Sequence, residues 1–329
     1  MKKVKIAVVT GPTATGKTAF AVRLAAALDG EIISVDSRQL YRGLDIGSGK
    51  DIGEYTLPSG KKIPAHLIDI ADPMHPYNLA EFMSDCHAAI AGIRTRNALP
   101  VLCGGTALYL DAVLRSYRLQ GGAPDPGKRQ EKRSLPTEEL RRLLAEKEPD
   151  SEILRREPDN RIRIIRRLEQ LEENPDSVLL DTANAPHPEY DFLVLGVLRS
   201  RSELHQRIEQ RLDDRLAHGM LDEAVRLHEQ GVPWERLEFF GLEYRYMALH
   251  LQGKLTFREM RDQLLIKIRQ FAKRQDSWFR NMERNGIPIY WFKPEEFEAA
   301  LDLSRRFLAD DPLPRPEFKL SETFYGPRS

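Results

Sequence analysis

The sequence predicts an α/β protein with a parallel sheet core, a helical insertion and a helical C-terminal region. Two observations lead to this fold class. Short, continuous apolar runs alternate with helix-like segments up to about residue 103, as in parallel sheets that are covered on both faces. A stretch dense in Arg and Glu then follows with helical spacing and no strand candidate, and a strand pattern returns near residue 193.

The elements can be placed in order along the chain. Strands are expected at 4–9, 31–35, 66–70, 100–103, 193–198 and 287–292, and helices at 18–28, 79–93 and over most of 202–284. Residues 119–126 form a turn-rich linker, and 135–173 are helical. The expected domains are therefore 1–118 with 191–292 as the core, 119–190 as the insertion, and 293–329 as a C-terminal segment with a Pro-rich polar tail. Ligands of such sheets bind beyond the carboxyl ends of the strands.

Composition excludes several classes of protein. The 329 residues are 41% hydrophobic and 30% charged, which supplies a sizeable core and excludes wholesale disorder. The net charge is zero, so any surface for nucleic acid must be a local one. The two cysteines, Cys86 and Cys103, provide neither a disulfide framework nor zinc spacing, and no apolar run has the length of a membrane span. We expect a soluble, cytoplasmic protein without a membrane partner.

A phosphate-binding loop follows the first expected strand. Residues 11–18 read Gly-Pro-Thr-Ala-Thr-Gly-Lys-Thr and match G-x-x-x-x-G-K-[ST], between a strand and a helix as the mechanism requires. The glycines let backbone amides turn toward a polyphosphate, Lys17 adds a positive charge, and the Thr18 hydroxyl can bind Mg²⁺. The motif predicts a core like that of the P-loop NTPases. The residues expected to bind a diphosphate are Gly11, Pro12, Thr13, Ala14, Thr15, Gly16, Lys17 and Thr18.

The loop is compatible with two kinds of chemistry: phosphoryl transfer, or the release of a diphosphate leaving group. The strand at 100–103 ends in Gly104-Gly105-Thr106, where an NTPase often carries an acidic residue. The acid that does end a strand is Asp36, a candidate general base or metal ligand. Asp36 and Ser37 could instead cap a following helix.

Six stretches of the chain, in order, resemble the tRNA dimethylallyltransferase (tRNA isopentenyltransferase) family. They are GPTATGKT at 11–18, ISVDSRQLYRGLDIGSGK at 33–50, HLIDIADP at 66–73, CGGTALYL at 103–110, HQRIEQRL at 205–212 and AKRQDSWFR at 272–280. The resemblance implies transfer of a five-carbon prenyl group from dimethylallyl diphosphate to the N6 amine of a tRNA adenosine just 3′ of the anticodon. It also implies Mg²⁺ as cofactor and the anticodon stem-loop as partner.

The resemblance assigns roles to single residues. Asp36 is similar to the family's general base, Thr106 to a residue that binds substrate near the reacting centre, and Arg211 to a further cation for the diphosphate. Without the resemblance, Arg211 could not be chosen over Arg207 or Arg215, because most arginines of such a helix are solvated. The residues that resemble the family's tRNA contacts are Asp36, Ser37, Arg38, Gln39 and Thr106, together with Arg163 and Arg166 in the insertion. We expect a monomer.

The chain departs from the family pattern at three places, and this leaves the acceptor open. The family commonly has Thr-Ala-Lys-Pro where this chain has Ser-Gly-Lys-Asp at 48–51. Within an insertion that is shorter than typical, residues 159–163 read Asp-Asn-Arg-Ile-Arg where the family has Asn-Asp-Pro-Gln-Arg. Residues 241–246 read Gly-Leu-Glu-Tyr-Arg-Tyr where the family has Gly-Tyr-Arg-Gln. A free adenine nucleotide is an alternative acceptor, a nucleotide or small-molecule kinase is an alternative enzyme, and a non-catalytic RNA-binding protein is a third hypothesis. The arginine-rich runs at 155–167 and 267–284 would bind RNA phosphates or form salt-bridged helix faces.

Overall fold

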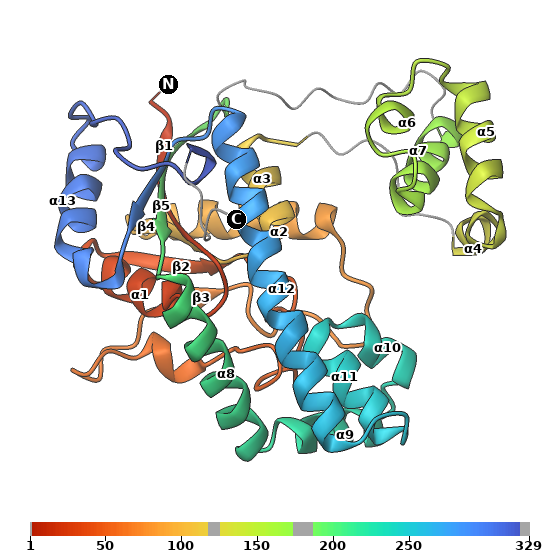
Figure 1. The fold of residues 1–329 in the computed structure, drawn as a ribbon. Helices are drawn as coiled ribbons and strands as arrows, with labels where there is room; N and C mark the ends of the chain where they lie inside the picture. Colours follow the sequence, from red (N-terminus) through yellow and green to blue (C-terminus); the bar gives the residue numbers. More distant parts are fainter. Residues whose placement is uncertain (1, 118–125, 174–186, 323–329) are drawn as a thin grey trace. The chain divides into compact units, whose positions relative to one another are not determined.

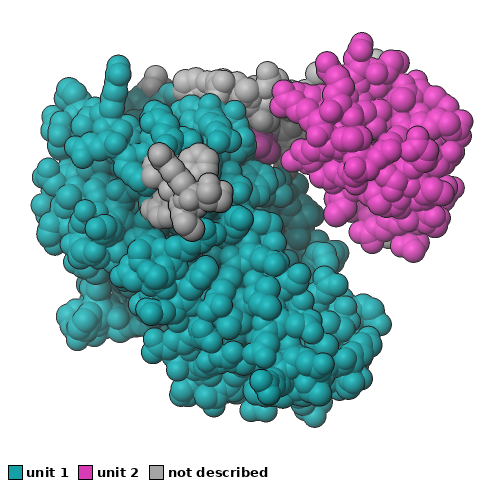
Figure 2. Space-filling model, in the orientation of Figure 1, with its two compact units in different colours: residues 1–116, 183–329 teal, residues 117–182 magenta. Residues whose placement is uncertain are grey.

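The computed structural model describes residues 2–117, 126–173 and 187–322 (Figure 1). The chain divides into two compact units, which Figure 2 distinguishes by colour. The first comprises residues 1–116 and 183–329, and the second comprises residues 117–182. Each unit has its own hydrophobic core.

The first unit is built on a parallel sheet of six strands in the order β3-β2-β4-β1-β5-β6. The strands are β1 (Val4–Thr10), β2 (Gly30–Ser34), β3 (Ala65–His66), β4 (Leu99–Cys103), β5 (Tyr190–Val197) and β6 (Ile289–Phe292). The register pairs Ala7 of β1 with Val101 of β4 and with Leu193 of β5. The second unit is thus inserted in the sequence between elements of one continuous sheet, and the predicted parallel sheet is confirmed.

Helices cover both faces of this sheet (Figure 1). On one face lie α1 (Lys17–Ala27) and α13 (Phe297–Leu308), whose apolar side chains join alternate strand residues such as Ala7, Val9 and Leu195 in one core. On the other face lie α2 (Leu79–Thr95) and α3 (Ala107–Leu114). Burial on both faces explains why the strands read as continuous apolar runs.

A group of helices follows β5. It comprises α8 (Arg201–Ala217), α9 (Met220–Glu229), α10 (Trp234–Phe239), α11 (Leu242–Leu251) and α12 (Phe257–Arg284). α12 begins at a capping box in which the Thr256 and Glu259 side chains each accept the other's backbone N–H. None of the helices in the described ranges is both long and apolar enough to span a membrane.

The second unit is helical, with α4 (Pro126–Ser134), α5 (Thr137–Lys147), α6 (Glu152–Arg156) and α7 (Arg161–Glu173). Its core consists of one apolar stripe from α5 and one from α7. The buried residues are Leu140, Leu144, Ile164, Ile165, Leu168 and Leu171. The spacings of three and four residues are those of facing amphipathic helices.

Some elements differ from the sequence-based expectation. The strand expected at 66–70 ends at His66, because Leu67 and Asp69 adopt left-handed backbone conformations with φ of 59° and 57°. The sequence reading missed α4 and α13. Within the expected polar tail, Leu320 is buried and the Glu283 carboxylate accepts the backbone N–H groups of Leu320 and Ser321. The linker expected at 119–126 lies, except for the first residue of α4, outside the described residues.

Candidate active site

Three loops converge at the carboxyl edge of the sheet, after β1, β2 and β4. The Thr10 hydroxyl donates to the Gly104 carbonyl at 2.9 Å, and the Thr106 amide donates to the Val35 carbonyl at 3.2 Å. Gly104 is required here, because a Cβ at this position would lie 2.1 Å from the Val35 carbonyl oxygen. These contacts place Asp36, Thr106 and the phosphate loop at one edge of the sheet.

The phosphate loop leads from β1 into the N-terminus of α1. Gly16 occupies the N-cap with φ of 91°, and the backbone N–H groups of residues 14–18 donate to no other group among the described residues. Free amides at a helix N-terminus form a cradle for anions. Desolvation, as the largest cause, lowers the pKa of Lys17, so its charge is held in a poorly solvated place beside this cradle.

Side chains from two C-terminal helices hold the loop from outside. Gln275 of α12 accepts the Thr13 amide at 2.9 Å and donates to the Gly105 carbonyl at 3.0 Å, so it bridges the loops after β1 and β4. Arg207 of α8 donates to the Ala14 carbonyl at 2.9 Å. These fixed contacts preorganise the cradle, which reduces the reorganisation needed when an anion binds.

Arg211 is the arginine of α8 that binds a hydroxyl group of the loop. Its Nη2 donates to Thr13 Oγ1 at 2.6 Å. Burial, as the largest cause, and next the neighbouring charge of Arg215 lower the pKa of Arg211 to about 10. The structure thus places the expected cation at the loop, and it distinguishes Arg211 from Arg207, which binds a loop carbonyl.

Asp36 is positioned by the turn that it caps. Its Oδ1 accepts the Arg38 amide at 2.9 Å and the Gln39 amide at 3.4 Å, whereas Oδ2 has no hydrogen-bond partner in the described part of the chain. Asp36 therefore caps a turn, as its alternative role predicts, but it does not cap a helix, because no helix begins directly after it. The Thr106 hydroxyl accepts the Ser37 amide at 3.1 Å, which brings Thr106 beside the carboxylate.

Gln39 and Arg38, the other two residues of this turn that are expected to contact tRNA, differ in whether their side chains already have hydrogen-bond partners. The Gln39 side chain donates to the Gly49 carbonyl at 3.0 Å and accepts from the Ser34 hydroxyl, so it has a structural role. The Arg38 guanidinium lies over the Phe239 ring, with 5.5 Å between the Arg38 Cζ and the ring centroid, and makes no hydrogen bond to any described residue. Desolvation lowers the pKa of Arg38, so an anionic or aromatic ligand would find this cation weakly hydrated.

Arg163 and Arg166 belong to α7 of the second unit and are ion-paired there. Arg163 pairs with Glu157, and Arg166 pairs with Glu169 at 3.4 Å. The other arginines of the 155–167 run also have partners within this unit: Arg155 with the Asp150 carbonyl, Arg156 with Glu152, Arg161 with the Leu135 carbonyl and Arg167 with Glu148. The run therefore has the character of a salt-bridged helix face, in which RNA phosphates would compete with carboxylates.

Comparison with known proteins identifies the family. The family model described as IPP transferase matches residues 39–282, and the model described as isopentenyl transferase matches residues 4–59. The chain belongs to the IPP transferase family.

Curated relatives in this family cover most of the chain. A protein named tRNA dimethylallyltransferase 1 from Syntrophus aciditrophicus is 44% identical over 89% of this chain and 95% of its own length. One named tRNA dimethylallyltransferase 2 from Trichlorobacter lovleyi is 45% identical over 86% and 90%. The predicted resemblance to the tRNA dimethylallyltransferases is confirmed.

Two solved structures have a similar fold. A tRNA isopentenylpyrophosphate transferase from Bacillus halodurans superimposes with a TM-score of 0.66 at 32% identity, over 94% of this chain and 96% of that one. A eukaryotic dimethylallyltransferase described as acting on tRNA gives a TM-score of 0.76 at 23% identity, over 95% and 81%, a likeness of fold. The predicted P-loop type of core agrees with these neighbours.

The ligands that this IPP transferase fold offers a metal ion suit Mg²⁺. The Thr18 hydroxyl at the start of α1 makes no hydrogen bond to a described residue, and carboxylates of the same edge, Asp36 and Glu54, act electrostatically on the adjacent Lys17. Hydroxyl and carboxylate oxygens are hard ligands, which Mg²⁺ prefers. In the described ranges, no group of three or more His, Cys, Asp or Glu residues could hold a metal ion, so oxygens of a bound ligand or of water would have to complete the site.

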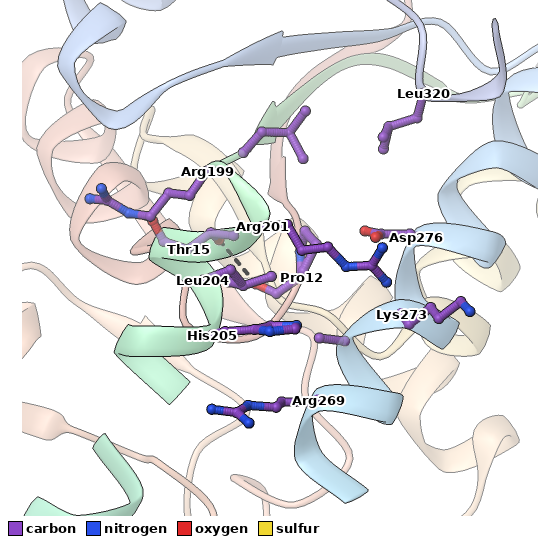
Figure 3. A pocket seen from close by; sticks show the side chains of 12 residues that line it. Pro12, Thr15, Arg199, Arg201, Leu204, His205, Arg269, Lys273, Asp276 and Leu320 are labelled. Atoms are coloured by element: carbon purple, nitrogen blue, oxygen red, sulfur yellow. Dashed lines mark hydrogen bonds between the residues drawn. The ribbon is translucent and has the colours of Figure 1, made fainter. Parts of the chain in front are cut away.

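A small pocket of about 30 Å³ lies between the phosphate loop and side chains of α8 and α12 (Figure 3). It is lined by Pro12 and Thr15 of the loop and by side chains from α8 and α12, including Arg201, Arg269 and Asp276. A volume of this size holds water molecules and not a substrate. Burial, as the largest cause, raises the pKa of Asp276 to about 6 against the opposing influence of Arg280 and Arg201.

The raised pKa of Asp276 predicts a pH-dependent stability. The folded protein holds this proton up to about pH 6 and the unfolded chain releases it near 3.8, so ionisation of Asp276 lowers the free energy of unfolding as pH rises between these values. Asp276→Asn should therefore raise the free energy of unfolding by about 1–2 kcal/mol above pH 6, after a discount for partial solvation. Urea titrations from pH 4 to 8 would measure this gain, which should shrink toward pH 4. The exposed Asp302→Asn is the control, and a gain independent of pH would contradict the assignment.

Sequence reasoning missed functional neighbours that the structure brings in. Gln275 lies within the family-like stretch at 272–280, but it is assigned no role from the sequence. In the structure its side chain is 4% exposed and connects the loops after β1 and β4. Gln275 follows Ala272 by three residues and precedes Phe279 by four, and a glutamine in this apolar register of an amphipathic helix is a signal that could have found it. Glu54 and Glu243 also act on Arg211, and desolvation raises the pKa of both carboxylates. Nothing local in the sequence connects them with the loop.

Proposed function

We propose that the protein transfers a dimethylallyl group from dimethylallyl diphosphate to N6 of a tRNA adenosine next to the anticodon. The observation that carries this is the free Oδ2 of Asp36 beside Thr106, at the sheet edge that also presents the phosphate loop. The names of the relatives support the same reaction. The strand end after β4 carries Gly104, Gly105 and Thr106 and no acid, which favours a diphosphate leaving group over phosphoryl transfer.

In the reaction, the N6 lone pair forms a bond to the allylic carbon while the bond from that carbon to the diphosphate oxygen breaks. The Oδ2 of Asp36 accepts the proton that N6 loses, because Oδ1 is occupied by two backbone N–H groups. Thr106 holds the acceptor nitrogen or the donor near the carboxylate. Negative charge grows on the leaving diphosphate, and the loop amides, Lys17 and Arg211 stabilise it.

Mg²⁺ is the expected cofactor, with Thr18 as its protein ligand. When bound, it would offset charge on the diphosphate oxygens. The acceptor adenosine has to leave the stacked anticodon loop to reach Asp36, with the turn at residues 36–39 as the surface next to it. Arg163 and Arg166 of the insertion are the proposed contacts to the anticodon stem-loop, and we expect the enzyme to act as a monomer in the cytoplasm.

The test incubates the purified protein with labelled dimethylallyl diphosphate and either bulk tRNA or AMP, with Mg²⁺ present. We expect label to enter tRNA at adenosine next to the anticodon, detected as N6-isopentenyladenosine after nuclease digestion. Label in AMP alone would show that the acceptor is a free nucleotide. A parallel reaction with labelled ATP tests the kinase alternative, and transfer of phosphate without prenyl transfer would overturn the proposal.

A further inference from the structure

A row of arginines runs along one face of α8. Arg207, Arg211 and Arg215 are four residues apart, so their side chains lie on the same side of the helix. The first two bind the phosphate loop directly, at the Ala14 carbonyl and the Thr13 hydroxyl. Arg215 continues the row but makes no hydrogen bond to residues 11–18, all of which the structure describes. Its Nη2 instead pairs with Asp51 Oδ2 at 3.1 Å, and its side chain is only 11% exposed.

The guanidinium of Arg215 lies at a place where residue 49 has no side chain. A Cβ on Gly49 would lie 2.4 Å from Arg215 Nη2 and 3.1 Å from its Cζ, so the guanidinium rests directly on the Gly49 backbone. Gly49 also has φ of 70°, a conformation that side chains disfavour. Asp51, two residues later, supplies the carboxylate. Gly49 and Asp51 therefore both lie against one arginine.

The segment that holds Arg215 is itself rigidly anchored. Lys50, 1% exposed, donates to the Tyr41 carbonyl at 2.9 Å and pairs with Asp45 at 2.7 Å and with Asp69. On the other side, the Glu223 carboxylate accepts the backbone N–H groups of residues 45, 46 and 47. A buried cation and a buried carboxylate, each with several partners, fix the backbone between them. Arg215 is thus held in one position before any ligand binds.

Arg215 also lies within electrostatic reach of the diphosphate-binding cations. Its charge is the second cause, after burial, that lowers the pKa of Arg211. Lys17, Arg211 and Arg215 all act on one carboxylate, Glu54. Like charges four residues apart on a helix repel each other, and the folded protein bears this cost in the absence of ligand. An anion with several charges beside Arg211 would relieve it.

We propose that Arg215, beside Gly49 and paired with Asp51, is a positioning residue whose charge, one helical turn from Arg211, strengthens binding of the diphosphate, both in the donor and as it leaves. Arg211 touches the loop, and Arg215 acts through it and through its own charge. The inference rests on the proposed function for the identity of the anion as a diphosphate. It adds to that function a second arginine that is specified by the segment at residues 49–51.

The test measures binding of inorganic pyrophosphate to the full chain by calorimetry, without an acceptor, and donor kinetics with tRNA. Arg215→Gln should weaken pyrophosphate binding about tenfold, raise KM for dimethylallyl diphosphate more than it lowers kcat, and reduce the salt dependence of binding. Arg215→Lys should restore most of the affinity. Gly49→Ala should also weaken pyrophosphate binding, because the added methyl group would displace the Arg215 guanidinium without changing its charge. The matched control is Arg226→Gln, an exposed arginine of α9.

Thermal unfolding distinguishes this role from a purely structural one, in which the ion pair of Arg215 and Asp51 only holds the segment at residues 49–51 in place. If the role is purely structural, Arg215→Gln and Asp51→Asn should lower the melting temperature by similar amounts and leave the pyrophosphate affinity at the wild-type value. That result would overturn the proposal. Wild-type affinity in Arg215→Gln with prenyl transfer intact would also overturn it and leave the proposed function standing. If the wild-type protein binds pyrophosphate more tightly than Arg215→Gln does but prenylates neither tRNA nor AMP, the proposed function is wrong and the role of Arg215 in anion binding is supported.

Discussion

Asp36→Asn should slow prenyl transfer by about 10³-fold while pyrophosphate binding changes little. A positioned general base contributes about 10²–10⁴-fold, and the amide that replaces the carboxylate cannot accept the N6 proton at Oδ2. The amide oxygen can still accept the Arg38 and Gln39 amides, so the turn should keep its shape. Single-turnover transfer to tRNA and calorimetry with pyrophosphate measure the two effects separately.

Two controls sharpen this result. Asp29→Asn, an exposed position before β2, should leave both quantities at wild-type values. Asp36→Ala removes the turn contacts as well, and it should add a loss of thermal stability to the loss of rate. An Asp36→Asn variant that loses transfer and pyrophosphate binding equally would show that Asp36 acts as a structural or metal-binding residue.

Local patterns were sufficient for the core of the fold. Continuous apolar runs gave β1, β2, β4, β5 and β6 to within a few residues, because strands buried on both faces have this signature. The run at 66–70 also contains three apolar residues, but positive φ at Leu67 and Asp69 ends β3 after His66. Backbone sterics at two residues therefore outweighed apolar content. Helix α13 was missed because its strongly amphipathic sequence lies between β6 and a tail rich in proline.

The site could be predicted only where a motif is contiguous. The phosphate loop is one such motif, since its amides, lysine and hydroxyl come from eight successive residues. The contacts of Gln275 with Thr13 and of Arg215 with Asp51 span more than 160 residues in the sequence. Such pairs are set by how helices α8 and α12 pack at the sheet edge, which no local pattern encodes. Arg211 was chosen by resemblance, and its hydrogen bond to Thr13 now gives a physical reason for the choice.

Lys17→Met should lower kcat for prenyl transfer by about 10²–10³-fold, the range for loss of one preorganised group that stabilises developing charge. Methionine keeps the length of the side chain and removes its charge. The charge of Lys17 is poorly solvated, as the lowered pKa of the lysine indicates, so it acts strongly on a diphosphate in the adjacent cradle. The exposed Lys61→Met is the matched control, and transfer at the wild-type rate in Lys17→Met would contradict the role.

Stability and pH dependence distinguish this role from a structural one. Desolvation penalises the charged form of Lys17 in the folded state, so its removal should not lower the free energy of unfolding at pH 7 and should raise it slightly. The same lowered pKa means that the wild-type rate should fall on the alkaline side before an ordinary lysine titrates, whereas the residual rate of Lys17→Met should lack this fall. A charged residue that the folded state keeps although it costs stability, and whose loss slows the reaction, acts on the leaving diphosphate. Urea titrations and rate profiles from pH 7 to 10 measure both effects, and a variant that loses stability along with activity would show that Lys17 supports the loop itself.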